Sequence, residues 1–366
     1  MTVGIVGAGQ LGRMLALAGY PLGLDFLFLD QSATTPGGQV APILCGALDD
    51  PALLRELSGR CEVLTFDWEN VSVDALRALG PKVRIAPPIG ALAVAQDRVE
   101  EKKLFERLGI PTTQWRAVDS AADLARAVSR LGLPAVVKTR RMGYDGKGQA
   151  VLRKPADIAR AWDELGASPL ICENLVDFDA EASAIGVRST RGEIALYPLS
   201  GNVHRDGILR LTRAPYGRAA LAALAGRHVR RILKAFDYTG VMAIEFFVRR
   251  GKLIANEIAP RVHNSGHWTI EGAVTSQFEN HLRAILGLPL GSTAATGHSA
   301  MINFIGALPP RERVLGRAGV HFHDYGKTPR PGRKLGHCTL IETSARTRDL
   351  AARKLLKQLA LPLSFP

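Results

Sequence analysis

The stretch of this chain that most constrains its fold runs from Glu245 to Trp268, with the sequence EFFVRRGKLIANEIAPRVHNSGHW. Two runs with strand composition, 241–248 and 252–258, are joined by a short turn, which predicts an antiparallel hairpin. Glu245 and Glu257 lie inside these apolar strands, where a charge is costly unless it is paired or bound to metal. The stretch therefore predicts a metal site that continues into a polar cluster. The alternative is a pair of acids on the solvated face of an edge hairpin.

The register of this hairpin decides whether the two acids meet. We expect a three-residue loop over 249–251, which places Val248 opposite Lys252. Glu257 then lies one diagonal step from Glu245, on the same face of the hairpin. A two-residue loop would place the two carboxylates on opposite faces. The metal prediction therefore requires a loop of odd length.

Length and charge limit the class of protein. A chain of 366 residues with 46% hydrophobic content predicts a globular enzyme of two or three domains with a large core. The net charge of +13 suits small anionic substrates, because the basic residues are spread along the chain and no RNA-binding motif or zinc finger is present. We therefore expect no nucleic-acid partner.

The chain carries features of a cytoplasmic protein. Its four cysteines have no paired spacing and are expected to be buried free thiols in a reducing cytosol. The apolar N-terminus lacks a basic leader, and Arg13 and Asp25 interrupt its hydrophobic run, which argues against a signal peptide. No apolar run is long enough to span a bilayer, so we expect no membrane association.

The first part of the chain, 1–96, predicts a parallel, Rossmann-like α/β domain. A strand at 2–6 precedes the turn Gly7 to Gly12, a helix follows at 11–18, and a second strand ends at Asp30. This order fits the dinucleotide fingerprint, which taken alone suggests an NAD-dependent oxidoreductase. The turn itself indicates only an anion at the start of the helix. Weaker units follow, with helices near 51–57 and 73–79 and strands at 62–66 and 82–85.

After residue 96 the chain alternates helices and strands and then becomes strand-rich. We therefore expect a fold that is α/β in the first part of the whole chain and α+β overall. Helices are expected near 97–108, 121–131, 157–165 and 218–236, with strands at 135–138, 149–152, 170–173 and 181–187 and hairpins through 193–212. The last helix is expected at 278–286. We place a central domain at 97–290, and a small β-rich domain with a basic Pro/Gly-rich segment, 327–334, at 291–366.

The segment GYDGKGQ, 143–149, predicts a phosphate-binding loop. Its three glycines expose backbone N–H groups between two strands, and Lys138 ends the preceding strand. Arg140 and Arg141 add positive charge, whereas a flexible hairpin loop is the simpler alternative. Weaker signals of a nucleotide site follow. The strand that leads to Glu173 could offer backbone groups to an adenine, and Glu181 and His204 are further candidates. None of these signals is specific alone.

Taken together, these motifs resemble one superfamily. Lys138, the 143–149 loop, Glu173, Glu181 and the acids of the hairpin occur in the order of an ATP-grasp enzyme, with a central two-lobed domain and a mobile lid at about 112–176. Within this superfamily, the chain is similar to the N5-carboxyaminoimidazole ribonucleotide synthetases of purine biosynthesis. The segments that carry this resemblance are GQLGRM, GYDGKGQ, YPLSGNVHRDGILR, NEIAPRVHNSGHWT and RPGRKLGH. The resemblance covers nearly the whole chain, although the residues after Leu350 match nothing usable.

The resemblance implies an ATP-dependent carbon–nitrogen ligase. Such enzymes carboxylate the exocyclic amine of 5-aminoimidazole ribonucleotide with bicarbonate, giving ADP and phosphate through carboxyphosphate. It also implies ATP and Mg²⁺ as cofactors and a cytoplasmic homodimer. Two other assignments stay open: another ATP-grasp carboxylase or transformylase and, with less support, the oxidoreductase.

The resemblance also implies roles for individual residues. Those implied to bind ATP are Arg98, Lys138, Gly143, Tyr144, Asp145, Gly146, Lys147, Gly148, Gln149, Glu173, Asn174, Leu175, Val176, Glu181, His204, Asn256 and Glu257. Those implied to bind the ribonucleotide or bicarbonate are Gln10, Leu11, Tyr144, Asp145, Arg261, His263, Asn264, Ser265, Lys327, Arg333 and Lys334. Glu245 and Glu257 are the implied metal ligands, and the implied catalytic residues are Asp145, Arg261, His263 and Asn264.

Overall fold

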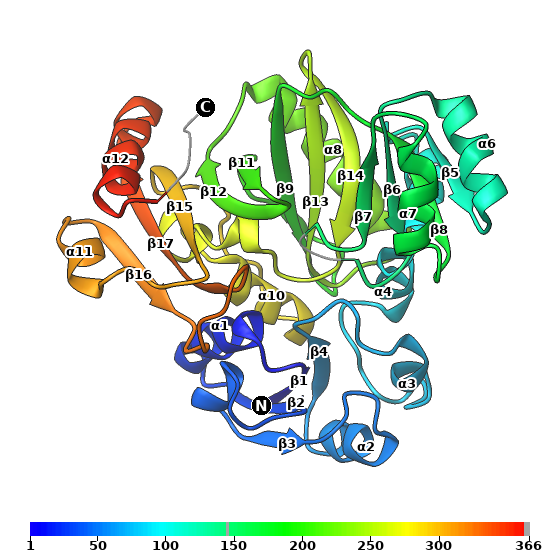
Figure 1. Cartoon of the computed structure of the whole chain (residues 1–366). Helices are drawn as coiled ribbons and strands as arrows, with labels where there is room; N and C mark the ends of the chain where they lie inside the picture. The colour runs from blue at the N-terminus through cyan, green and yellow to red at the C-terminus, as the bar shows by residue number, and fades with distance from the viewer. Residues whose placement is uncertain (144–145, 362–366) are drawn as a thin grey trace.

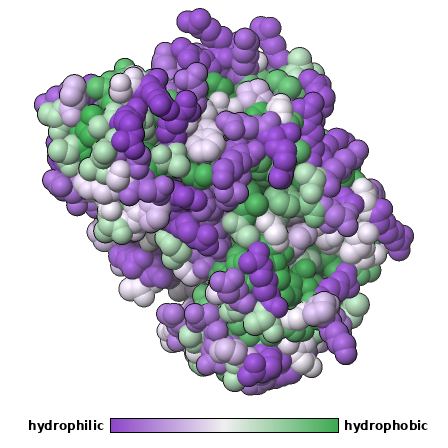
Figure 2. All heavy atoms as spheres, turned by 90° about the vertical axis from the view of Figure 1, so that its right-hand side faces the viewer, coloured by the Kyte–Doolittle hydropathy of each residue, from purple (hydrophilic) through white to green (hydrophobic). Residues whose placement is uncertain are grey.

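The computed structural model describes residues 1–143 and 146–361. Figure 1 shows a small sheet that contains the N-terminus below a larger central sheet, a four-stranded sheet at one side, and the C-terminal strands and helix at the other. Figure 2 shows a mostly hydrophilic face, with apolar residues gathered in its lower half. No helix among the described residues is long and apolar enough to cross a membrane.

The N-terminal sheet is fully parallel, as predicted, with the strand order β3-β2-β1-β4. Its elements are β1 (Thr2–Val6), α1 (Gln10–Gly19), β2 (Asp25–Asp30), β3 (Ile43–Cys45), α2 (Pro51–Gly59), β4 (Val63–Phe66), α3 (Val73–Arg77) and α4 (Ile89–Ala95). The strand expected at 82–85 is wrong. The backbone hydrogen bonds that join this segment to Leu64 run from Leu64 N to Arg84 O and from Ala86 N to Leu64 O, so Ile85 forms an isolated bridge to Leu64 and not a strand.

A four-stranded antiparallel sheet forms a separate lobe, which we call the lid lobe (β5 to β8). Its order is β5-β8-β6-β7, from β5 (Trp115–Val118), β6 (Ala135–Thr139), β7 (Gln149–Leu152) and β8 (Leu170–Asn174). The helices α6 (Ala121–Leu131) and α7 (Asp157–Leu165) bury Leu124, Val128 and Ala161 against it. Ser120 caps α6 by accepting a hydrogen bond from the backbone N–H of Asp123.

The central sheet has nine strands and two differently covered faces. In β13 (Gly240–Arg249), Met242, Ile244 and Phe246 pack in a cluster with α8 (Ala219–Ala235), whereas Val241 and Ala243 pack in a cluster with α10 (Gln277–Leu286). Side chains alternate along a strand, so Glu245 lies on the face away from α8. The path is β14-β13-β9-β11-β12-β15-β17-β16, with β10 beside β9. The remaining strands before the C-terminal part are β9 (Ala180–Arg188), β10 (Ile194–Leu196), β11 (Ser200–Arg205), β12 (Ile208–Ala214) and β14 (Lys252–Ala259).

The C-terminal strands extend this same sheet, because β15 (His298–Ile305) pairs with β12 and is followed by β17 (Lys334–Glu342) and β16 (Val320–Asp324). The expectation that the helix ending at Leu286 is the last one is wrong. The structure adds α11 (Arg311–Leu315) and α12 (Ala345–Gln358). Ser344 caps α12 in a capping box, and Ala351, Ala352, Leu355 and Leu356 bury one helix face in a cluster with β15 and β17 residues.

Candidate active site

The predicted hairpin forms, but its loop differs from the prediction. Arg249 pairs with Lys252, so the loop has two residues, Arg250 and Gly251, rather than three. Both have positive φ, 49° and 73°, which is the backbone of the tight turn that matches the twist of the two strands. The requirement for an odd-length loop is therefore wrong.

A β-bulge brings the two acids together instead. Phe246 pairs with Ala255 and Glu245 pairs with Glu257, so Asn256 is an extra residue on β14. One extra residue reverses the alternation of side chains beyond it, which cancels the effect of the even loop. Glu245 and Glu257 thus lie directly opposite each other on one face, as the metal prediction requires.

The two carboxylates are held in different electrostatic states. Burial raises the pKa of Glu245 to about 7, and the charge of Glu257 adds to this against the opposing effect of His204. Burial alone would also raise the pKa of Glu257, but Arg98, whose Nη1 lies 2.9 Å from Glu257 Oε2, lowers it. The unliganded site therefore combines one ionised acid with one that resists ionisation.

This arrangement fits a magnesium ion. Asn256 Oδ1 is buried and has no hydrogen-bond partner among the residues that the structure describes, so an oxygen ligand is available beside Glu257. No group of three or more His, Cys, Asp or Glu suited to a metal occurs within residues 1–143 and 146–361. Mg²⁺ commonly takes one or two carboxylates and completes its shell with water and substrate phosphates. The site thus suits an ion that arrives with a nucleotide.

A buried ion network joins the lid lobe to α5 (Arg98–Arg107). Glu173 Oε1 lies 2.9 Å from Lys138 Nζ, and Glu173 Oε2 lies 3.1 Å from Lys102 Nζ and accepts a 2.5 Å hydrogen bond from Thr113. Burial alone would raise the pKa of Glu173, but the two lysines outweigh it and lower the pKa. Lys138 and Glu173, both predicted, therefore form one site with Lys102, which was not.

Two side chains of α5 that sequence reasoning missed hold the bulge. Lys102 Nζ donates to Asn256 O over 2.8 Å, and Glu101 Oε1 accepts from Ile258 N over 2.6 Å. Glu101 is 1% exposed, and burial raises its pKa to about 8. The available signal was the spacing of Arg98, Glu101 and Lys102, which places all three on one helical face.

The glycine loop lies over Arg98. A side chain on Gly143 would contact Arg98 Nη2, and one on Gly146 would contact the backbone of Gly207 in the β11–β12 turn. Gln149 pairs with Lys138, and Gly148 and Lys147 belong to the same loop. Tyr144 and Asp145 lie outside the described residues.

The remaining predicted nucleotide residues fall in two places. Glu181 Oε2 lies 2.9 Å from His204 Nδ1, on the same sheet face as Glu245. Burial alone would lower the pKa of His204, but Glu181 and Glu245 raise it. In the lid lobe, Asn174 Oδ1 accepts from Gln114 N and Leu175 N donates to Pro134 O, while Val176 is buried.

The polar cluster after the hairpin is largely satisfied from within the protein. Arg261 Nη2 lies 2.8 Å from Glu69 Oε2, and His263 Nε2 lies 3.5 Å from Glu245 Oε1. Ser265 Oγ lies 2.8 Å from His263 Nδ1. The amide of Asn264 makes a reciprocal pair with Asn303, at 3.2 and 2.7 Å. Burial, with the charges of Arg261 and Lys334, lowers the pKa of His263.

The basic C-terminal turn approaches the N-terminal domain. Lys327 Nζ donates to Gln10 Oε1, and burial together with Arg333 lowers the pKa of Lys327 to about 8. The charge of Lys334 opposes the rise in the pKa of Glu245. Arg333 donates to Thr328 O over 3.1 Å. Leu11 points into the core and is 6% exposed, so only its backbone is available to a ligand.

The glycine turn after β1 is occupied by the protein's own acids. Asp30 Oδ2 accepts from Ala8 N over 2.7 Å, and Asp67 Oδ2 accepts from Gly12 N over 3.2 Å. A side chain on Gly7 would collide with Asp67 Oδ1. These carboxylates take the position at the helix start that a dinucleotide phosphate would need. The fingerprint is thus explained without NAD, and sequence reasoning missed the part that Asp67 plays in filling this turn.

Asp67 predicts a specific pH dependence of stability. Burial raises its pKa from 3.8 to about 6, so the folded state retains a proton that the unfolded state releases. Its contribution is fully present below about pH 4 and is lost as the pH rises through about 6, a change of roughly 3 kcal/mol. We expect the free energy of unfolding of the wild type, minus that of Asp67→Asn, to fall by this amount between pH 4 and 8. Urea denaturation at each pH measures the difference, and a constant difference would contradict the assignment.

A model of the ATP-grasp domain matches residues 103–278, and a model of the ribonucleotide synthetase preATP-grasp domain matches residues 1–96. A model of the phosphoribosylaminoimidazole carboxylase C-terminal domain matches residues 299–349. The fold and its acid pair thus define an ATP-grasp enzyme.

Individual relatives narrow this class. An N5-carboxyaminoimidazole ribonucleotide synthase of Pseudomonas aeruginosa is 52% identical over 93% of this chain and 94% of its own length. The chain belongs to the N5-carboxyaminoimidazole ribonucleotide synthase family. The Thermus thermophilus synthetase structure has 49% identity, covers 99% of this chain and 100% of its own, and gives a TM-score of 0.94. The Aspergillus clavatus enzyme in complex with ADP and the aminoimidazole ribonucleotide has 31% identity, 98% coverage of both chains and a TM-score of 0.92.

Proposed function

We propose that this chain uses ATP and bicarbonate to carboxylate the exocyclic amine of 5-aminoimidazole ribonucleotide, giving N5-carboxyaminoimidazole ribonucleotide, ADP and phosphate in purine biosynthesis. The observation that carries the proposal is the pairing of Glu245 with Glu257 beside the network of Lys138 and Glu173. These acids and cations lie where the lid lobe meets the central sheet, and relatives of this chain are named as complexes with ADP or ATP.

The nucleotide half of the reaction depends on positioning and charge. Lys138 and Arg98 are proposed to bind phosphate oxygens, and the backbone of 143–149 is proposed to close over them and exclude water. Water must be excluded because carboxyphosphate hydrolyses readily. Glu173 orients Lys138 through its ion pair, and residues 174–176 are proposed to frame the adenine. Glu181 is proposed to bind the ribose, and its partner His204 to lie near the nucleotide or bicarbonate.

The metal proposal names Mg²⁺ held by Glu245, Glu257 and Asn256. When bound, the ion would neutralise phosphate charge during phosphoryl transfer. The protein contributes the rest: Arg98 lowers the pKa of Glu257, and the bulge places Asn256, whose buried Oδ1 has no partner among the described residues, next to Glu257 in the chain. Glu101 and Lys102 secure the bulge from α5.

The acceptor half is proposed to lie between the polar cluster and the basic turn. Arg261, His263, Asn264 and Ser265 would position bicarbonate and carboxyphosphate, with Tyr144 and Asp145 contacting the ribonucleotide. Lys327, Arg333 and Lys334 suit its 5′-phosphate because Lys327 donates to Gln10 and the charges of Arg333 and Lys334 act on the pKa of Lys327. Proton transfer from the amine is assigned to Asp145, and neutral His263 lies beside Glu245.

Three further assignments accompany this function. We propose a cytoplasmic homodimer, supported by the prevalence of symmetric oligomers among such enzymes. We propose domain boundaries near residues 96 and 290, with a mobile lid at about 112–176. The lid assignment is supported by the separate sheet and core of β5 to β8.

The function is tested by ADP release from Mg-ATP in the presence and absence of 5-aminoimidazole ribonucleotide and bicarbonate. We expect strong stimulation only when both co-substrates are present. Matched reactions with other amine acceptors of ATP-grasp carboxylases and transformylases serve as controls. Absence of stimulation by the ribonucleotide would remove the specific assignment, even if ATP is hydrolysed.

A further inference from the structure

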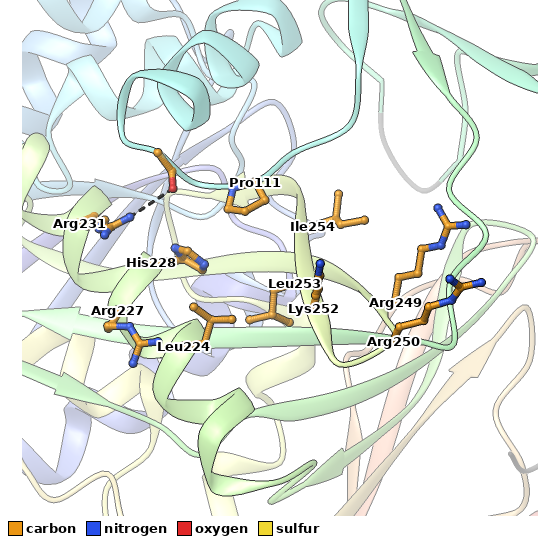
Figure 3. A pocket seen from close by; sticks show the side chains of 11 residues that line it. Pro111, Leu224, Arg227, His228, Arg231, Arg249, Arg250, Lys252, Leu253 and Ile254 are labelled. Carbon is orange, nitrogen blue, oxygen red and sulfur yellow. Dashed lines mark hydrogen bonds between the residues drawn. The ribbon is translucent and has the colours of Figure 1, made fainter. Parts of the chain in front are cut away.

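A basic pocket lies on the far side of the central sheet from the acid pair. It has a volume of about 700 Å³ and is lined by α8, by the tip of the β13–β14 hairpin and by the segment 109–111 (Figure 3). Leu253, which lines it, packs in the cluster that contains α8, whereas Glu245 lies on the opposite face. The pocket is therefore separate from the site described above.

The charge of this pocket is uniformly positive. The cations that line it are Arg227 and Arg231 of α8 at one end, Arg249 and Arg250 of the hairpin tip at the other, and Lys252 between them (Figure 3). Among the residues that the structure describes, none that lines this pocket is acidic. The side chains of Arg227, Arg249 and Lys252 have no ion-pair or hydrogen-bond partner within the described part of the chain. Cations gathered without counter-charge attract an anion.

A buried histidine at this pocket also lacks partners. His228 is 4% exposed, yet neither ring nitrogen has a hydrogen-bond partner among the described residues. Its ring lies 6.0 Å from that of Phe246, and Figure 3 shows it between α8 and the strand that lines the pocket. A buried polar group without a partner is costly, so a ligand that hydrogen-bonds to the ring would remove this cost.

The remaining lining is apolar, from Pro111, Leu224, Leu253 and Ile254. A pocket of this size with apolar walls and a few polar groups is typical of small-molecule sites. We propose that it binds a phosphate-bearing small molecule of nucleotide size, whose phosphate lies among the arginines and Lys252 and whose apolar body faces Leu224 and Leu253. This site is distinct from the proposed catalytic function and stands without it.

The pocket also touches the connection to the lid lobe. Arg231 Nη1 donates to Leu108 O and Gly109 O, each over 3.2 Å, just before the chain enters β5. An anion that draws Arg231 toward itself would act on this connection. Occupancy is therefore expected to change the lid lobe as well as the pocket.

The test is AMP binding to the whole protein while the active site is saturated with Mg-AMP-PNP. Isothermal titration should show one AMP per chain under these conditions, and adenosine should bind at least about tenfold more weakly because it lacks the phosphate. The double variant Arg227→Ala/Lys252→Ala should weaken AMP binding at least about tenfold. Arg230→Ala, which removes an exposed arginine of the same helix that does not line the pocket, should leave it unchanged.

A variant of His228 distinguishes a residue that contacts the ligand from one that only fills the core. His228→Leu keeps an apolar filling beside Phe246 and should weaken AMP binding several-fold while ADP release stays at the wild-type rate. The proposal is overturned if Mg-AMP-PNP abolishes AMP binding, or if the double variant binds AMP as tightly as Arg230→Ala does. Equal binding of adenosine and AMP would also overturn it.

Discussion

Replacing Glu257 with glutamine should abolish ADP release while the protein remains folded. The substitution keeps the shape of the side chain but removes the charge that pairs with Arg98 and faces Glu245. Loss of several kcal/mol of charge stabilisation at the phosphates corresponds to a fall in kcat on the order of 10³-fold. Steady-state ADP release at saturating Mg-ATP, ribonucleotide and bicarbonate measures the effect.

The control for this variant is Glu312→Gln, an exposed acid in α11, which should retain wild-type kcat. Far-ultraviolet circular dichroism should be the same for both variants and the wild type. The thermal shift that Mg-ATP produces should be lost only in Glu257→Gln. Wild-type turnover in that variant would defeat the assignment of the acid pair.

Replacing Glu173 with glutamine should cause the largest loss of stability. Glu173 is 1% exposed and is the carboxylate between Lys102 and Lys138. Its loss leaves two largely buried ammonium groups without that counter-charge. Breaking a buried ion pair in this way typically costs ~3–5 kcal/mol. Urea denaturation followed by circular dichroism should show this fall in the free energy of unfolding.

The matched control is Glu164→Gln, an exposed acid on α7 in the same lobe, which should change stability by no more than about 0.5 kcal/mol. Hydrogen exchange should locate the effect of Glu173→Gln in β6 and β8, since the ion network joins those strands to α5. Equal stability of the two variants would show that the lysines are solvated or neutral without Glu173.

Local sequence patterns predicted most of the elements near the site. The helices at 121–131 and 157–165 and the strand at 149–152 agree with α6, α7 and β7 at both ends. Their signals are local, such as the cap at Ser120 and the alternation of apolar residues. The helix α12 carries similar signals in Ser344 and its apolar spacing, although no helix was expected there.

The sequence by itself determined which chemical groups the site contains: two acids in neighbouring strands, a lysine at the end of a strand and a glycine loop. Only the tertiary structure decided how they meet. The bulge at Asn256 depends on Lys102 and Glu101, which reach it from a helix more than 150 residues earlier. No local pattern in β14 records those contacts, because they form only when α5 packs against the hairpin. The same holds for Asp67, whose carboxylate fills the glycine turn once β4 lies beside β1.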